Sequence, residues 1–180
     1  MILALALLAC TPDDVTDEQK DTASADTDTD TDTDTDTDTD TDTDASMAGD
    51  IHDGWLSEGA DISVLFQGAP FSFVSVSAVF NTDQGYGVVA TDGEGAVTNF
   101  AGTFVVDATT SPGTITLTQS APYAATSVGI YQVDGDTLTY EAVQTVPDYG
   151  FTPPTPETGF GTTAGPGVVA GSNVQIYQRR

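Results

Sequence analysis

The stretch from 71 to 106 reads FSFVSVSAVFNTDQGYGVVATDGEGAVTNFAGTFVV. In its first ten residues, apolar side chains recur at every second position, which predicts a strand with one buried face. The apolar positions of this face are Val74, Val76, Ala78 and Phe80. Turn-forming residues at 81–85 and 92–95 separate this strand from two further ones, expected at 86–91 and 96–106. The stretch therefore predicts three strands joined by tight turns.

The third of these strands also has a predicted inner face. Phe100, Phe104 and Val106 fall on one side of it, together with Gly102. A glycine within a strand is typical of a bend or of a close approach of another backbone. We therefore expect one of these at Gly102.

The same pattern extends in both directions from this stretch. Further strands are expected at 51–59, 114–119, 127–133, 137–143 and 173–178, and residues 61–66 form either a helical turn or a strand continuation. Eight strands with short turns and no amphipathic helix favour an up-and-down barrel over a sandwich, because closure removes the exposed edges. The predicted fold is therefore all-β, a single antiparallel up-and-down barrel of about eight strands.

One segment of the body lacks this pattern. Residues 147–171 hold five of the nine prolines and many glycines, and a loop of this length within a compact domain is often functional. Its aromatic residues, Phe151 and Phe160, either cap the mouth of the barrel or offer a contact surface.

A run of alternating Asp and Thr occupies residues 26–44. As a strand it would place carboxylates about 6–7 Å apart on one face, within the Debye length of about 8 Å, and it has no apolar residue to bury. This composition is typical of a disordered chain stiffened by self-repulsion. We expect a disordered acidic linker over 10–49, with weak cation binding as the alternative interpretation.

The charge of the chain excludes some partners. The formal net charge is −25, and the 12 acidic residues after position 50 face two arginines, which leaves −10 on the body. Three basic residues in the whole chain cannot neutralise a phosphate backbone, so the composition excludes nucleic-acid binding.

The first nine residues are all apolar and precede the only cysteine, Cys10. They are too few for a transmembrane helix but fit the apolar core of a signal peptide. Leu7, Leu8, Ala9 and Cys10 resemble the bacterial lipobox, which implies cleavage before Cys10 and lipidation of that residue. The predicted organisation is a signal peptide over 1–9, a lipidated linker over 10–49 and a barrel domain over 50–180.

The body resembles the lipocalin-like barrel domain of bacterial lipoproteins. The resemblance rests on Gly54 and Trp55 in the first strand, on Gly102 to Phe104 ahead of Asp107, and on the hairpin 131–140. In lipocalins a Trp near the start of the first strand closes one end of the barrel, and an Arg after the last strand packs across it. The resemblance implies these roles for Trp55 and for either Arg179 or Arg180, in a cation–π contact.

The aromatic side chains of the body are the candidate ligand contacts. A barrel of eight strands is either filled by side chains or holds one small ligand, and the sequence leaves both alternatives open. The predicted ligand-binding residues are Trp55, Phe80, Phe104, Tyr131, Tyr140, Phe151 and Phe160.

Motifs for catalysis and metal binding are weak. His52 is the only histidine, and Ser57 and Asp53 lie on the same short strand, where they cannot converge on it. One histidine and one cysteine do not make a zinc site, although Asp53, Glu58 and Asp61 gathered at one barrel end would suit calcium. We expect no catalytic residues, no bound metal and no cofactor.

These observations together predict a monomeric lipoprotein that Cys10 anchors in the bacterial outer membrane, facing the periplasm or the cell surface. Its barrel is expected to be a non-enzymatic binding module for a small apolar ligand or an envelope component. The alternative is a structural or protein-interaction domain with a filled interior, which uses its outer face or the loop 147–171. The sequence does not identify a protein partner.

Overall fold

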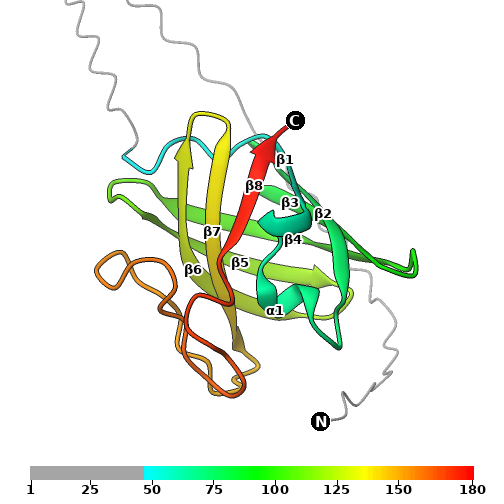
Figure 1. The fold of residues 1–180 in the computed structure, drawn as a ribbon. Helices are drawn as coiled ribbons and strands as arrows, with labels where there is room; N and C mark the ends of the chain where they lie inside the picture. The colour runs from blue at the N-terminus through cyan, green and yellow to red at the C-terminus, as the bar shows by residue number, and fades with distance from the viewer. Residues whose placement is uncertain (1–46) are drawn as a thin grey trace, which may run out of the picture. The chain divides into compact units, whose positions relative to one another are not determined.

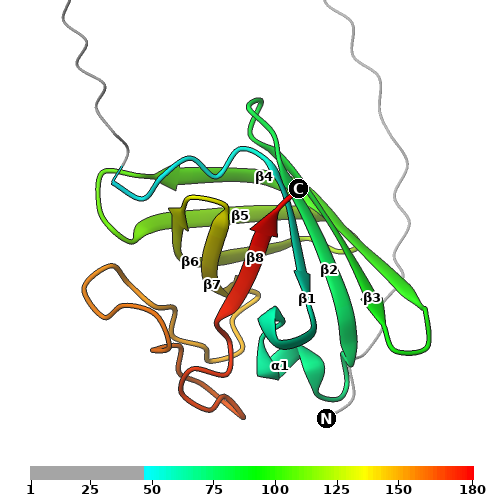
Figure 2. The same cartoon turned by 45° about the horizontal axis from the view of Figure 1, so that its top comes forward.

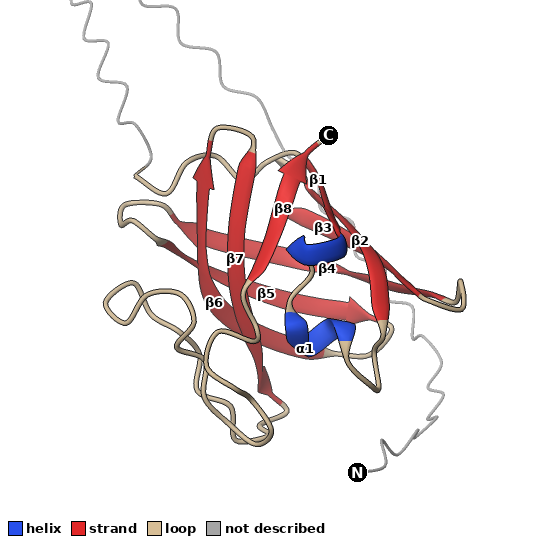
Figure 3. Cartoon of the chain, viewed as in Figure 1, coloured by secondary structure: helices blue, strands red, loops and turns tan. Residues whose placement is uncertain are grey.

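The computed structural model describes residues 47–180, which fold into a closed antiparallel barrel (Figures 1 and 3). Each strand pairs with the next, and β8 pairs with β1 to close the barrel. The strands are β1 (Gly54–Glu58), β2 (Phe73–Phe80), β3 (Gly85–Asp92), β4 (Val97–Asp107), β5 (Gly113–Ala121), β6 (Ala125–Asp134), β7 (Thr137–Val146) and β8 (Gln175–Arg179). The predicted eight-stranded up-and-down barrel is confirmed. The predicted signal peptide, the lipidation site at Cys10 and the Asp/Thr run lie outside the described residues.

Two short helical segments follow β1. They are a 3₁₀ turn over Gly59–Asp61 and the single-turn helix α1 over Val64–Gln67, so the helical alternative for 61–66 is the correct one. Within the described part of the chain, no helix has the length and apolar character needed to cross a membrane.

A bulge in β2 corrects the predicted inner face of that strand. The pairing of β2 with β3 skips Val74, which lies between Phe73 and Ser75. One extra residue shifts the alternation of side chains to the opposite face, so Val74 is 52% exposed. The prediction that it is buried was wrong. The rest of the predicted face is buried and consists of Val76, Ala78 and Phe80.

The close approach expected at Gly102 is confirmed. A Cβ atom there would lie 2.1 Å from the carbonyl oxygen of Thr118 on β5, and the register of β4 with β5 shifts between Ala101 and Gly102. Only glycine fits this contact. It allows β5 to cross closely over β4 while Phe104 still points into the core.

The two ends of the barrel differ. Residues 47–53 lie across the end where β1 begins and β8 finishes, and α1 lies at the opposite end (Figures 1 and 2). We name them the Trp55 end and the α1 end. The N–H of Val133 donates to the carbonyl of Ala48 at 2.8 Å, and both Ala48 and Ile51 are buried. The segment before β1 therefore covers the Trp55 end.

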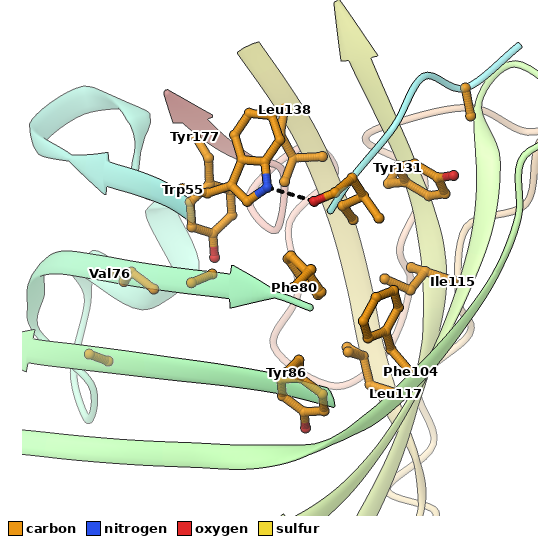
Figure 4. Packing of buried hydrophobic residues seen from close by; sticks show 14 residues of the cluster. Trp55, Val76, Phe80, Tyr86, Phe104, Ile115, Leu117, Tyr131, Leu138 and Tyr177 are labelled. Carbon is orange, nitrogen blue, oxygen red and sulfur yellow. Dashed lines mark hydrogen bonds between the residues drawn. The ribbon is translucent and has the colours of Figure 1, made fainter. Parts of the chain in front are cut away.

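The core occupies the Trp55 half of the barrel. Figure 4 shows Trp55 and Tyr177 on one side of the cluster and Phe104, Ile115 and Tyr131 on the other. Because these side chains are almost fully buried, their packing supplies most of the apolar burial that stabilises the fold. The cluster comprises Ala48, Ile51, Trp55, Val76, Ala78, Phe80, Tyr86, Ala90, Phe104, Ile115, Leu117, Tyr131, Leu138 and Tyr177.

Candidate functional site

The Trp55 end is closed by an interaction that was predicted. The guanidinium carbon of Arg179 lies 4.6 Å from the centroid of the Trp55 ring, and the indole N–H donates to the carbonyl of Ile51 at 2.8 Å. Arg179 also pairs with Asp53, and its Nε lies 3.3 Å from Asp136. The expected cation–π contact is confirmed, and Arg179 is the arginine that makes it.

Carboxylates border this end and affect nearby groups. The N–H of Gly54 and then the Arg179 guanidinium hold the pKa of Asp53 below its usual value. Burial, with smaller contributions from the Asp50 and Asp107 carboxylates, raises the pKa of Tyr131 to about 12. An anion would therefore meet negative charge at this end.

A depression of about 380 Å³ lies at the Trp55 end beside His52 and Tyr131. The Nδ1 atom of His52 is 2.6 Å from an Asp50 carboxylate oxygen, a pair that sequence reasoning missed because it considered only Asp53. The other residues around the depression are Gly49, Ile51, Val106 and Ala108. Within residues 47–180 neither a serine nor a cysteine lines it, so His52 has no nucleophile to activate there.

Four of the predicted ligand contacts come together in the filled half of the barrel. Trp55, Phe80, Phe104 and Tyr131 belong to one buried cluster, and the rings of Phe80 and Phe104 meet edge to face at 5.1 Å. Contact of these four with a ligand stays a prediction, since in this structure they contact one another.

The α1 half of the interior is accessible. By strand pairing, Thr98 lies opposite Ala90, Ser127 opposite Gln144, and Tyr140 opposite Tyr131. Their side chains therefore face the same interior as the core. Yet Thr98 is exposed, and Ser127, Gln144 and Tyr140 are half-buried. Among these inward-facing positions, solvent thus reaches Thr98 most and the other three in part.

Two buried polar atoms face this interior without a partner. Ser57 Oγ and Gln175 Nε2 make no hydrogen bond within residues 47–180, and both side chains are at most 1% exposed. Ser57 pairs with the core residue Val76, and Gln175 pairs with Tyr140. Buried donors are nearly always satisfied in native proteins. The sequence did not lead us to predict either residue as a ligand contact. The position that could have been recognised is Gln175, a polar side chain on the inner face of the last strand.

The rim of the α1 end is apolar. Many of the large apolar side chains that are exposed within residues 47–180 belong to the elements at the α1 end. The segment 47–53, which lies across the Trp55 end, contributes one of them, Met47. Exposed apolar groups are typical of surfaces that contact apolar partners. These rim residues are Val64, Phe71, Val74, Val97, Tyr123, Val146 and Tyr149.

The loop between β7 and β8 packs against the outside of the barrel. Glu141 on β7 is fully buried, and its carboxylate accepts the N–H groups of Gly161 at 2.5 Å and Thr163 at 3.1 Å. Glu141 pairs with Ile130 on the face opposite Tyr131 and Tyr140, so the loop covers the outer face of β6 and β7 (Figure 1).

Phe151 and Phe160 lie in this loop and are half-buried. Among the described residues, neither belongs to the core cluster or to the side chains packed against it. The structure therefore separates them from the other predicted ligand contacts.

The proposed gathering of acidic residues does not occur. Asp53 pairs with Arg179 at the Trp55 end, whereas Glu58 is at the far end of β1 and Asp61 follows it. That interpretation was wrong because the length of β1 separates the carboxylates. Residues 47–180 contain no group of three or more histidine, cysteine or acidic side chains placed to hold a metal.

Comparisons with known proteins found no relative of the chain. No protein family, no curated protein and no solved structure matches the chain.

Proposed function

We propose that the chain is a lipid-anchored binding protein whose barrel holds a small, largely apolar molecule through its α1 end. The observation that carries this proposal is the asymmetry of the interior. One half is filled by buried aromatics, and the other has inward-facing side chains that solvent reaches, behind an apolar rim. Apolar side chains combined with a few polar groups are typical of small-molecule sites.

We propose binding without catalysis. His52 has Asp50 as its partner at the Trp55 end, away from the accessible half of the interior. The residues that line that half are serine, threonine, glutamine, tyrosine and apolar side chains, which suit recognition by hydrogen bonds and contact.

Titration of the full chain with N-phenyl-1-naphthylamine, a neutral apolar fluorophore, tests the site. Thr98→Trp places a large ring inside the accessible half, and we expect at least ten-fold weaker binding. Asn99→Trp is the matched control, because Asn99 is the next residue of the same strand, is exposed and lines the outer surface. Absence of binding by the native chain would refute the proposal.

The alternative function, interaction through the outer face, has one observation in its favour. A depression of about 390 Å³ lies on the outside of β2, β3 and β4 and is bordered by Val79 and Val89, which are exposed. Its occupant would be blocked by Asn99→Trp and unaffected by Thr98→Trp. The same pair of variants therefore decides between the two faces of β4.

The proposed anchor is tested separately. We propose that Cys10 is lipidated and holds the protein on the outer membrane of a bacterial envelope, as its resemblance to a lipobox implies. Stable anchoring by acyl chains needs more than one chain, at about 0.8 kcal/mol for each buried methylene. Replacing Cys10 with Ala is expected to release the protein from the membrane fraction. Retention of the variant there would contradict the proposal.

A further inference from the structure

We infer that the ligand is amphipathic with an uncharged head, and that the head enters first and is held by Ser57 and Gln175. This inference rests on the proposed binding function and names the chemistry of its ligand. It starts from the two buried donors that lack partners, Ser57 Oγ and Gln175 Nε2.

The two donors belong to one wall of the barrel. Gln175 pairs with Tyr140 across β7 and β8, and the rings of Tyr140 and Tyr177 meet edge to face at 6.4 Å. Because β1 pairs with β8 through Leu56 and Gln178, the next inward position on β1, Ser57, lies beside Tyr177. A patch with two hydrogen-bond donors and two phenol rings thus forms where the accessible half meets the filled half.

Burial makes this patch a site for a hydrogen-bond acceptor. A buried donor without a partner is destabilising, and an oxygen atom of a ligand would remove that cost at both groups. Burial also raises the pKa of Tyr177 and of Tyr140 well above the usual value for a phenol. These phenols therefore stay neutral, so the patch carries no charge of its own.

The charges around the patch exclude an ionised acceptor. Within residues 47–180 the arginines are Arg179 and Arg180, and both lie at the Trp55 end, where the Arg179 guanidinium covers the indole and the backbone N–H of Arg180 donates to the Gly54 carbonyl. The acidic Glu58 lies at the α1 end of β1. Unlike Glu141, which accepts two backbone N–H groups, a carboxylate at this patch would have neutral side-chain donors and no cation to offset its desolvation. The head is therefore an alcohol, ester, amide or ketone.

The apolar rim fits the rest of such a molecule. Exposed apolar side chains on α1 and on the β5–β6 turn lie at the α1 end, including Val64 and Tyr123. A chain or ring system that follows the head would contact them and lose its water contact. The head therefore points inward and the apolar part outward.

Three probes with one chain length test the head group. Decanamide, decanoate and decylammonium are measured at pH 7.5 by displacement of N-phenyl-1-naphthylamine from the full chain, with calorimetry as the direct check. We expect decanamide to bind at least ten-fold more tightly than either ion. Equal or tighter binding of decanoate or decylammonium would overturn the inference while leaving the binding function intact.

Two variants test the residues. Ser57→Ala and Gln175→Met each remove one donor with little change of shape, and each is expected to weaken decanamide about five-fold, the factor for one neutral hydrogen bond. Binding of N-phenyl-1-naphthylamine itself should change less than two-fold. Because the donors have no partner in the free protein, thermal stability without ligand should be unchanged or higher.

A structural role for these residues would give the opposite pattern. Both variants would then melt at a lower temperature and weaken all probes equally, which would refute the assignment. If Thr98→Trp leaves every probe unaffected, the proposed interior site itself fails. If Thr98→Trp blocks binding of the probes, but Ser57→Ala and Gln175→Met weaken every probe by the same factor or none at all, only the inference about the head group fails.

Discussion

Replacement of Glu141 should detach the β7–β8 loop from the barrel. Glu141 is fully buried on the outer face of β7, and its two carboxylate oxygens accept one backbone N–H each, from Gly161 at 2.5 Å and from Thr163 at 3.1 Å. Hydrogen bonds to a charged group contribute about 1.5–3 kcal/mol each. The cost of burying the carboxylate offsets part of this.

Two substitutions of Glu141 are expected to destabilise the fold to different extents. Glu141→Gln keeps the volume and one acceptor oxygen but turns an amide N–H₂ toward the second N–H, so we expect a loss of about 1–2 kcal/mol in the free energy of unfolding. Glu141→Ala leaves both N–H groups without a partner and also a cavity, for a loss of about 3 kcal/mol. Glu58→Gln is the control, because Glu58 is exposed and, among the described residues, accepts a side-chain hydrogen bond from the Ser75 hydroxyl at 3.2 Å; its effect should stay within about 0.5 kcal/mol.

Urea unfolding measures the global loss, and hydrogen exchange measures the local one. The amides of Gly161 and Thr163 should lose protection in both Glu141 variants, and protease should cut within residues 147–174 before the barrel unfolds. Unchanged protection of these two amides in Glu141→Ala, or equal stability of Glu141→Gln and the native chain, would refute the reasoning.

Four further outcomes are expected. Arg179→Ala should lower stability by about 1 kcal/mol, mainly through the lost contact with the indole, as measured by urea unfolding. The lowered pKa of Asp53 stabilises the fold above about pH 4, and this contribution disappears as the pH falls through the pKa of the folded state. In Asp53→Asn the urea midpoint should therefore depend less on pH between about pH 5 and 2. The raised pKa of Tyr131, about 12, stabilises the fold below about pH 10, and this contribution is lost between pH 10 and 12; Tyr131→Phe should therefore reduce alkaline destabilisation in thermal melts. Gly102→Ala should cost about 3 kcal/mol because its Cβ would meet the backbone of Thr118 and Gln119, whereas Gly87→Ala, whose Cβ would meet open space, should be tolerated.

Some features of the fold follow from local sequence. Alternating side chains and turn residues predicted all eight strands, because the strand period and the turn preferences of glycine, asparagine and aspartate are local properties. The contact between Trp55 and an arginine after the last strand was also predictable, through resemblance to lipocalins. The bulge at Val74 was not predictable in this way, since it depends on the register that β2 adopts against β3.

The candidate site depended on long-range pairing. Ser57 and Gln175 lie more than a hundred residues apart in sequence and share one wall only because β8 returns to β1. In the same way, the loop that holds Phe151 and Phe160 packs against the outside of the barrel because a buried Glu141 binds its backbone. The sequence alone determined the strands, the order in which they pair and the acidity of the chain. Tertiary structure decided which inward-facing side chains are packed and which are accessible, because burial depends on closure of the barrel and on what covers each end.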